Sequence, residues 1–120
     1  MINYKIKTDK YGNELVNYVV LKGDTFVMSL SLSSNGEIVS RETIEKVVYK
    51  QADEDYVEVY SNEFEYDEEL QRYIMEIPSN VTSEFSEDIT YVYEIEVTMA
   101  GGNVITPTQA KIQFTSEIVK

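Results

Sequence analysis

The sequence predicts an all-β protein, an antiparallel β-sandwich, and three observations support this prediction. Apolar and polar residues alternate strictly along residues 89–97 (ITYVYEIEV) and again along residues 25–32 (TFVMSLSL). Glycine- or asparagine-containing turn signals recur at short intervals between such segments. No segment shows amphipathic spacing over a helical length. Strands with one buried face and short turns are typical of two sheets packed on one core.

Residues 89–97 have the clearest strand pattern and are expected to form a central strand. One face would be buried and the other exposed, so the inward row is Tyr91, Tyr93, Ile95 and Val97, and the outward row is Val92, Glu94, Glu96 and Thr98. A hairpin turn at residues 99–103 would bring back residues 111–116, with Ile112 and Phe114 inward. Tyr91 and Tyr93 are either core aromatics or tyrosine-corner residues whose hydroxyls bond a nearby backbone group.

The first third of the chain is expected to supply an early strand pair. Residues 1–12 form an arm or an edge strand, and residues 15–21 form a strand that ends at the turn of residues 22–24. In residues 25–32, Phe26, Met28, Leu30 and Leu32 would face inward, and serine and threonine would form the wet face. Residues 33–36 contain Asn-Gly and predict a tight turn.

The middle of the chain is expected to add further short strands. Residues 38–41 and 43–51 are assigned as strands, the second because its β-branched cluster outweighs a helical spacing. Residues 56–61 would be its hairpin partner, and residues 71–77 form a strand ended by Pro78. One helical turn in residues 80–87 would dock Val81 and Phe85.

The total of seven to eight strands in one domain of residues 1–120 is typical of the immunoglobulin-like sandwich, here without its usual disulfide and tryptophan.

Composition excludes several classes of function. The net charge of −12 makes nucleic acid and anionic membranes poor partners. The chain has no cysteine and no histidine, so the best nucleophile, the common general base and thiolate metal sites are absent. No catalytic motif is present, and we expect neither an enzyme nor a cofactor. The N-terminal segment has no apolar run that would predict a signal peptide.

Two sets of residues have alternative interpretations. The stretch between residues 51 and 71 holds nine acids and no Lys or Arg. It predicts a solvated face or, as a weaker alternative, a calcium site formed by Asp53, Asp55, Asp67 and Glu68. Five tyrosines lie outside the inward rows and form either an exposed protein-contact patch or cross-strand packing: Tyr49, Tyr56, Tyr60, Tyr66 and Tyr73.

Four short motifs carry a family resemblance. They are KGDTF at 22–26, YVYEI at 91–95, GGNVIT at 101–106 and AKIQF at 110–114. In this order they resemble small immunoglobulin-like β-sandwich domains of bacteriophage and prophage tail and baseplate proteins. Ala110 departs from the group, which often has glycine there, and the middle of the chain carries no match.

The resemblance implies a function. It implies a non-enzymatic structural or adaptor module that contacts other proteins, as a homo-oligomer or beside a neighbouring phage subunit. It also implies a location in the virion, or in the bacterial cytoplasm before assembly. The alternative is a bacterial surface or secreted module that binds calcium or carbohydrate through its acidic loops. Fold analogy by itself does not determine function.

Overall fold

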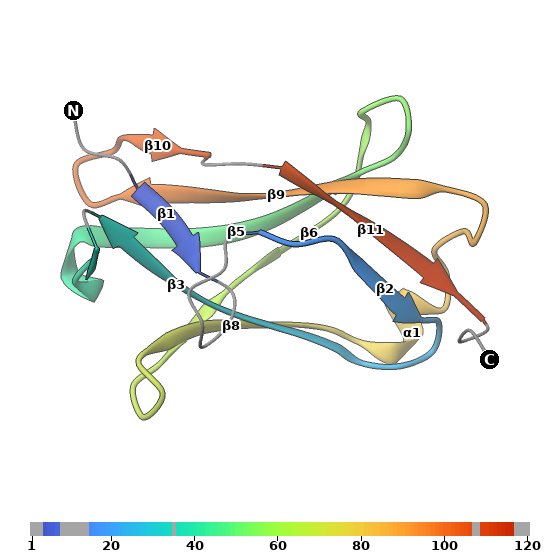
Figure 1. Ribbon diagram of the computed structural model, residues 1–120, viewed down its shortest axis with the longest axis horizontal. Helices are drawn as coiled ribbons and strands as arrows, with labels where there is room; N and C mark the ends of the chain where they lie inside the picture. The colour runs from blue at the N-terminus through green and yellow to red at the C-terminus, as the bar shows by residue number, and fades with distance from the viewer. Residues whose placement is uncertain (1–3, 8–14, 35, 107–108, 117–120) are drawn as a thin grey trace.

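A computed structural model describes residues 4–7, 15–34, 36–106 and 109–116, and in these residues two β-sheets pack against each other (Figure 1). The smaller sheet has the order β1 (Tyr4–Lys7), β3 (Phe26–Ser34), β8 (Arg72–Ile77) and β7 (Glu65–Asp67), with β4 (Glu37–Ile38) also paired to β3. The larger sheet has the order β2 (Tyr18–Leu21), β11 (Gln109–Thr115), β9 (Thr90–Met99), β5 (Ile44–Ala52) and β6 (Glu58–Glu63), with β10 (Val104–Ile105) beside β9.

This arrangement confirms the all-β sandwich. The specifically immunoglobulin-like connectivity stays a prediction. The described residues hold eleven strands, more than the seven to eight expected. The additional strands are β1, where an arm or an edge strand was expected, and β7 and β10, which are only three and two residues long. Among the same residues, no helix is long and apolar enough to cross a membrane.

Strand β9 is central to the larger sheet, as the alternation predicts. Tyr93, Ile95 and Val97 are fully buried, and β9 pairs with β5 on one side and β11 on the other. Ile112, expected to face inward, is buried and lies opposite Tyr91. The hairpin turn leads first to β10, which pairs with Val97 and Thr98 before the chain reaches β11.

The predicted strands of the middle region are confirmed with small shifts in their bounds. Residues 43–51 form β5, residues 56–61 overlap β6, and residues 71–77 form β8. The short strand expected at residues 38–41 ends at Ile38 and gives way to a 3-10 turn, η1 (Arg41–Thr43). The helical turn is also present as α1 (Ser79–Thr82), and Phe85 after it is buried.

Strand β2 corrects the purely antiparallel expectation, because it runs parallel to β11, with Tyr18 opposite Ile112. The turn at residues 22–24 carries the chain from β2 in one sheet to β3 in the other. Thr82 fixes this turn: its hydroxyl accepts from the Gly23 N–H (3.0 Å) and donates to the Asp24 carbonyl (2.8 Å). A period of two identifies the buried face of a strand but not its partner or direction.

The serine face of β3 is also less exposed than expected. Ser31 and Ser33 are buried. Strand β1 flanks this part of β3 on one side, and β4 reaches its end at Ser33 and Ser34. A serine side chain is too short to project far above neighbouring strands, so its polarity alone does not place it in water.

The core contains a continuous cluster of aromatic rings. Each ring lies within 4.7–6.3 Å of another, measured between centroids. The members are Tyr18, Phe26, Tyr49, Tyr60, Phe85, Tyr91, Tyr93 and Phe114. A separate pair, Tyr66 and Tyr73, packs edge to face at 5.0 Å. Offset and edge-to-face pairs of this kind stabilise a core beyond their buried area.

This cluster decides between the alternatives for the tyrosines. Tyr49 and Tyr73 are buried, and Tyr60 and Tyr66 are half-buried, so the five tyrosines do not form one exposed patch. Tyr56 is the exception, with 73% of its surface exposed.

Tyr91 and Tyr93 combine both expected roles. Their rings are core residues, and both hydroxyls bond backbone groups. The Tyr91 hydroxyl accepts from the Ser86 N–H (2.9 Å), and the Tyr93 hydroxyl donates to the Val16 carbonyl (2.6 Å).

Candidate functional site

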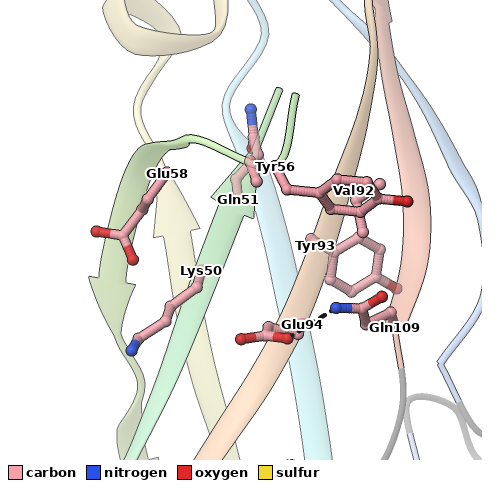
Figure 2. Close-up of a pocket in the computed structure, with 9 residues that line it drawn as sticks. Lys50, Gln51, Tyr56, Glu58, Val92, Tyr93, Glu94 and Gln109 are labelled. Atoms are coloured by element: carbon pink, nitrogen blue, oxygen red, sulfur yellow. Dashed lines mark hydrogen bonds between the residues drawn. The ribbon is translucent and has the colours of Figure 1, made fainter. Parts of the chain in front are cut away.

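The outer face of the larger sheet carries a groove of about 250 Å³ near the β5–β6 turn (Figure 2). Its lining comes from strands β5, β9 and β11, from the first residue of β6, and from Tyr56 on the turn at one end. In Figure 2, Tyr56 lies at that end, and Lys50, Glu94 and Gln109 lie toward the other. The full lining is Lys50, Gln51, Ala52, Tyr56, Glu58, Val92, Tyr93, Glu94 and Gln109.

The turn holds Tyr56 in an uncommon conformation. Its φ of 61° lies in the left-handed region, which is rare for a bulky residue. Two backbone hydrogen bonds of Asp53 stabilise the turn. The Asp53 carbonyl accepts from the Tyr56 N–H (3.0 Å), and the Asp53 N–H donates to the Val57 carbonyl (3.0 Å). The Asp53 carboxylate also accepts from the N–H groups of Asp55 (2.9 Å) and Val57 (3.0 Å). The turn therefore holds a large ring out in water at the mouth of the groove.

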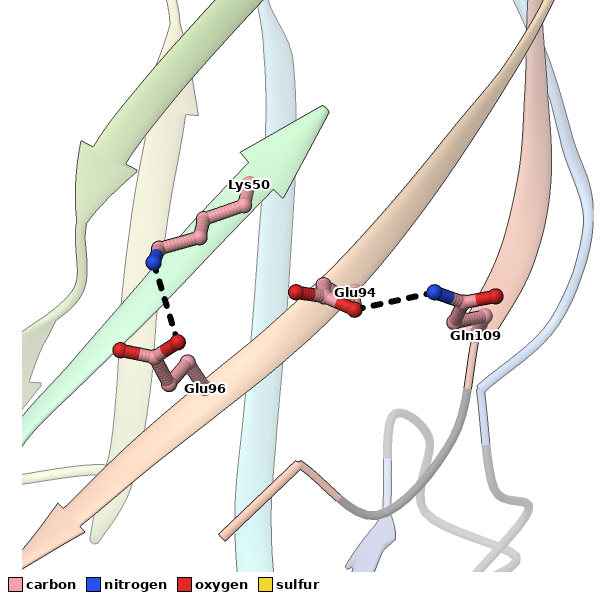
Figure 3. A network of polar contacts seen from close by, with 4 residues as sticks. All are labelled: Lys50, Glu94, Glu96 and Gln109. Carbon is pink, nitrogen blue, oxygen red and sulfur yellow. Dashed lines mark hydrogen bonds and ion pairs between the residues drawn. The ribbon is translucent and has the colours of Figure 1, made fainter. Parts of the chain in front are cut away.

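Strand register places a polar row along the groove. Glu94 lies opposite Lys50 on β5 and opposite Gln109 on β11, so the three side chains form a row across three strands. Gln109 Nε2 donates to Glu94 Oε2 (3.0 Å), and Lys50 Nζ pairs with Glu96 Oε2 (3.0 Å), as Figure 3 shows. The row thus combines donors and acceptors beside an aromatic ring.

The charge around Lys50 is predominantly negative. The hydrogen bond to Glu96 raises the pKa of the Lys50 ammonium, and the charges of Glu96, Glu58 and Glu94 raise it further. Three carboxylates surround one ammonium, so the groove has a negative field. The groups lining it can bind a ligand through hydrogen bonds and ring contact. Their arrangement includes no activated nucleophile of the kind that covalent catalysis uses.

The sequence pattern does not single out this site. Glu94 and Glu96 are interpreted from sequence only as acidic surface, and Tyr56 is one of five tyrosines with no assigned place. The outward positions of β9 were predictable from the alternation. Their alignment with Lys50 and Gln109 depends on register, which the alternation does not encode.

The four residues of the calcium alternative are not brought together. Asp53 and Asp55 lie on the β5–β6 turn, and Asp67 and Glu68 lie at the β7–β8 turn at the opposite end of the molecule (Figure 1). Asp67 Oδ1 accepts from the Leu70 N–H (3.0 Å), and Glu68 pairs with Arg41 (2.7 Å). In the part of the chain that the structure describes, no three acidic residues are grouped so that they could hold a metal ion.

No protein-family model matches the chain, and a search of curated proteins finds no match.

Proposed function

We propose that this domain is a non-enzymatic structural or adaptor module that acts through protein–protein contacts, in keeping with its resemblance to phage tail and baseplate domains. The observation that carries the proposal is the exposed edge of the larger sheet at β6. Val57, directly before this strand, and Val59, its second residue, are 58% and 43% exposed. Interface cores favour such apolar positions.

An edge strand provides a specific way to bind a partner. β6 is the last strand of its sheet and, among the described residues, has a strand partner only in β5. The backbone groups along its free side can therefore pair with an added strand from another protein. Val57 and Val59 would supply apolar contacts to the side chains of that strand.

The charge near this edge indicates the chemistry of the partner. A hollow of about 490 Å³ lies beside β6 and β7, and its lining includes Glu63, Glu65, Asp67 and Glu76. With a net charge of −12, two copies of the domain repel each other. A neighbouring subunit with an extended, basic segment is therefore favoured over self-association.

Complex formation with the products of flanking genes tests the proposal. Purified domain is mixed with each product, and the mass is measured by size-exclusion chromatography with light scattering. We expect a complex that the double variant V57S/V59S weakens. Val27→Ser is the matched control, because Val27 is 52% exposed but lies on β3 of the other sheet.

Two results would contradict the proposal. One is a domain that stays monomeric with every flanking product. The other is equal weakening of the complex by the control variant, which would assign the effect to general loss of surface valines.

A further inference from the structure

We propose that the groove below Tyr56 binds a neutral saccharide. This inference goes beyond the protein-contact role, because it concerns the outer face of the larger sheet. Three properties of the groove carry it: a presented aromatic ring, a row of mixed hydrogen-bonding groups, and a negative field.

The ring provides an apolar platform. A hexose has faces made of C–H groups, and these pack on the π-face of an aromatic side chain, whose electron-rich surface attracts the slightly positive hydrogens. Tyr56 is 73% exposed, so its face is available for such packing. The left-handed φ of 61° is rare at a bulky residue. The hydrogen bonds of the turn already hold the Tyr56 backbone in this conformation, so little backbone conformational entropy is lost there when a ligand binds.

The polar row complements sugar hydroxyls. Each hydroxyl donates one hydrogen bond and accepts others. Glu94 accepts, Lys50 donates, and the Gln109 amide does both. Neighbouring strands are about 4.8 Å apart, so the row across β5, β9 and β11 spans about 10 Å. That span suits one or two sugar rings better than a single ion.

The charge selects the class of saccharide. Glu58, Glu94 and Glu96 outnumber Lys50, and the Lys50 ammonium is already paired with Glu96 at 3.0 Å. A uronate or other acidic sugar would meet a negative field with no free cation in the groove to pair with. The groove volume of about 250 Å³ lies just below the usual range of ligand pockets, which indicates weak binding of a short oligosaccharide.

Titration followed by NMR chemical shifts tests the inference on the full chain. The probes are triacetylchitotriose, cellotriose and maltotriose, with trigalacturonate as the acidic counterpart. We expect at least one neutral trisaccharide to bind with a Kd of about 1 mM or tighter. Its largest shifts should fall on Val92, Glu94 and Gln109, and trigalacturonate should not bind.

Variants distinguish the contribution of the Tyr56 ring to binding from a general effect of changing an exposed residue. Tyr56→Ala should weaken binding of that trisaccharide at least about tenfold, whereas Tyr56→Phe should keep it. Leu70→Ala is the control, because Leu70 is 60% exposed on the β7–β8 turn at the far end and should leave binding unchanged. Val59→Ser changes the β6 edge but neither the turn bonds nor the groove lining, and it should also bind the sugar normally, so failure at the β6 edge and failure at the groove can be told apart.

Three results would overturn the inference. They are no shift with any neutral probe at about 10 mM, unaltered binding by Tyr56→Ala, and trigalacturonate binding as tightly as the neutral probes.

Discussion

The two faces of β9 have contrasting roles, although their residues alternate along one strand. The inward face carries Tyr91, Tyr93 and Ile95, all buried. The outward face carries Glu94 and Glu96, which are partly exposed and hydrogen-bonded to neighbouring strands. The difference shows that a single strand can hold the core together on one side and present binding chemistry on the other.

Three tyrosine hydroxyls on the inward face of the larger sheet form hydrogen bonds within the protein. The Tyr49 hydroxyl donates to Gln51 Oε1 at 2.5 Å, and the Tyr91 and Tyr93 hydroxyls bond backbone groups. A buried polar atom without a partner is costly, so these bonds allow tyrosine to serve as a core residue. On the outward face, water can replace any lost partner, and single contacts contribute little to stability.

The largest expected contrast comes from neighbouring residues on β11. Phe114 is fully buried against Phe85 and Tyr91, so Phe114→Ala should lower the free energy of unfolding by about 3–5 kcal/mol. Gln113 faces outward, and Gln113→Ala should change the free energy of unfolding by less than about 0.5 kcal/mol. Equilibrium urea unfolding measures both values. Similar losses for the two variants would contradict the assignment of the faces.

A second contrast should appear at alkaline pH. Burial raises the pKa of the Tyr49 hydroxyl, and the neighbouring Tyr93 raises it further. Burial likewise raises the pKa of Tyr93. The unfolded tyrosines ionise near pH 10, whereas the buried ones stay protonated, so stability is fully present below about pH 10 and falls above it.

The slope of this loss is measurable. Each tyrosine that stays protonated should cost about 1.4 kcal/mol of stability per pH unit above its unfolded pKa. Melting temperatures between about pH 8 and pH 11, with tyrosinate absorbance followed in parallel, test this. A melting temperature that does not fall across that interval would show that these hydroxyls are accessible to solvent in the fold.

The smallest contrast lies between two buried hydroxyls. Tyr91→Phe leaves the Ser86 N–H without its acceptor and should cost about 1–2 kcal/mol. The Tyr73 hydroxyl is buried and has no hydrogen-bond partner among the described residues, so Tyr73→Phe should be neutral or slightly stabilising. Urea midpoints of the two variants compare them directly. A larger loss from Tyr73→Phe than from Tyr91→Phe would refute this ordering of the two sites.

The sequence by itself determined the fold class and the buried faces of the main strands. Alternation in residues 25–32 and 89–97 depends only on the geometry of an extended chain, in which successive side chains point to opposite sides. Turn chemistry depends on local backbone preference, so the turns around Gly23 and Gly102, both with positive φ, were also predictable.

The tertiary structure alone decided which strands are neighbours and what they bring together. The parallel pairing of β2 with β11, the burial of Ser31 and the alignment of Lys50, Glu94 and Gln109 all depend on register between segments distant in sequence. The same holds for the separation of Asp53 from Asp67. Period-two patterns assign a face to each residue but carry no information about the partner strand, because any strand with the same alternation satisfies the core equally well.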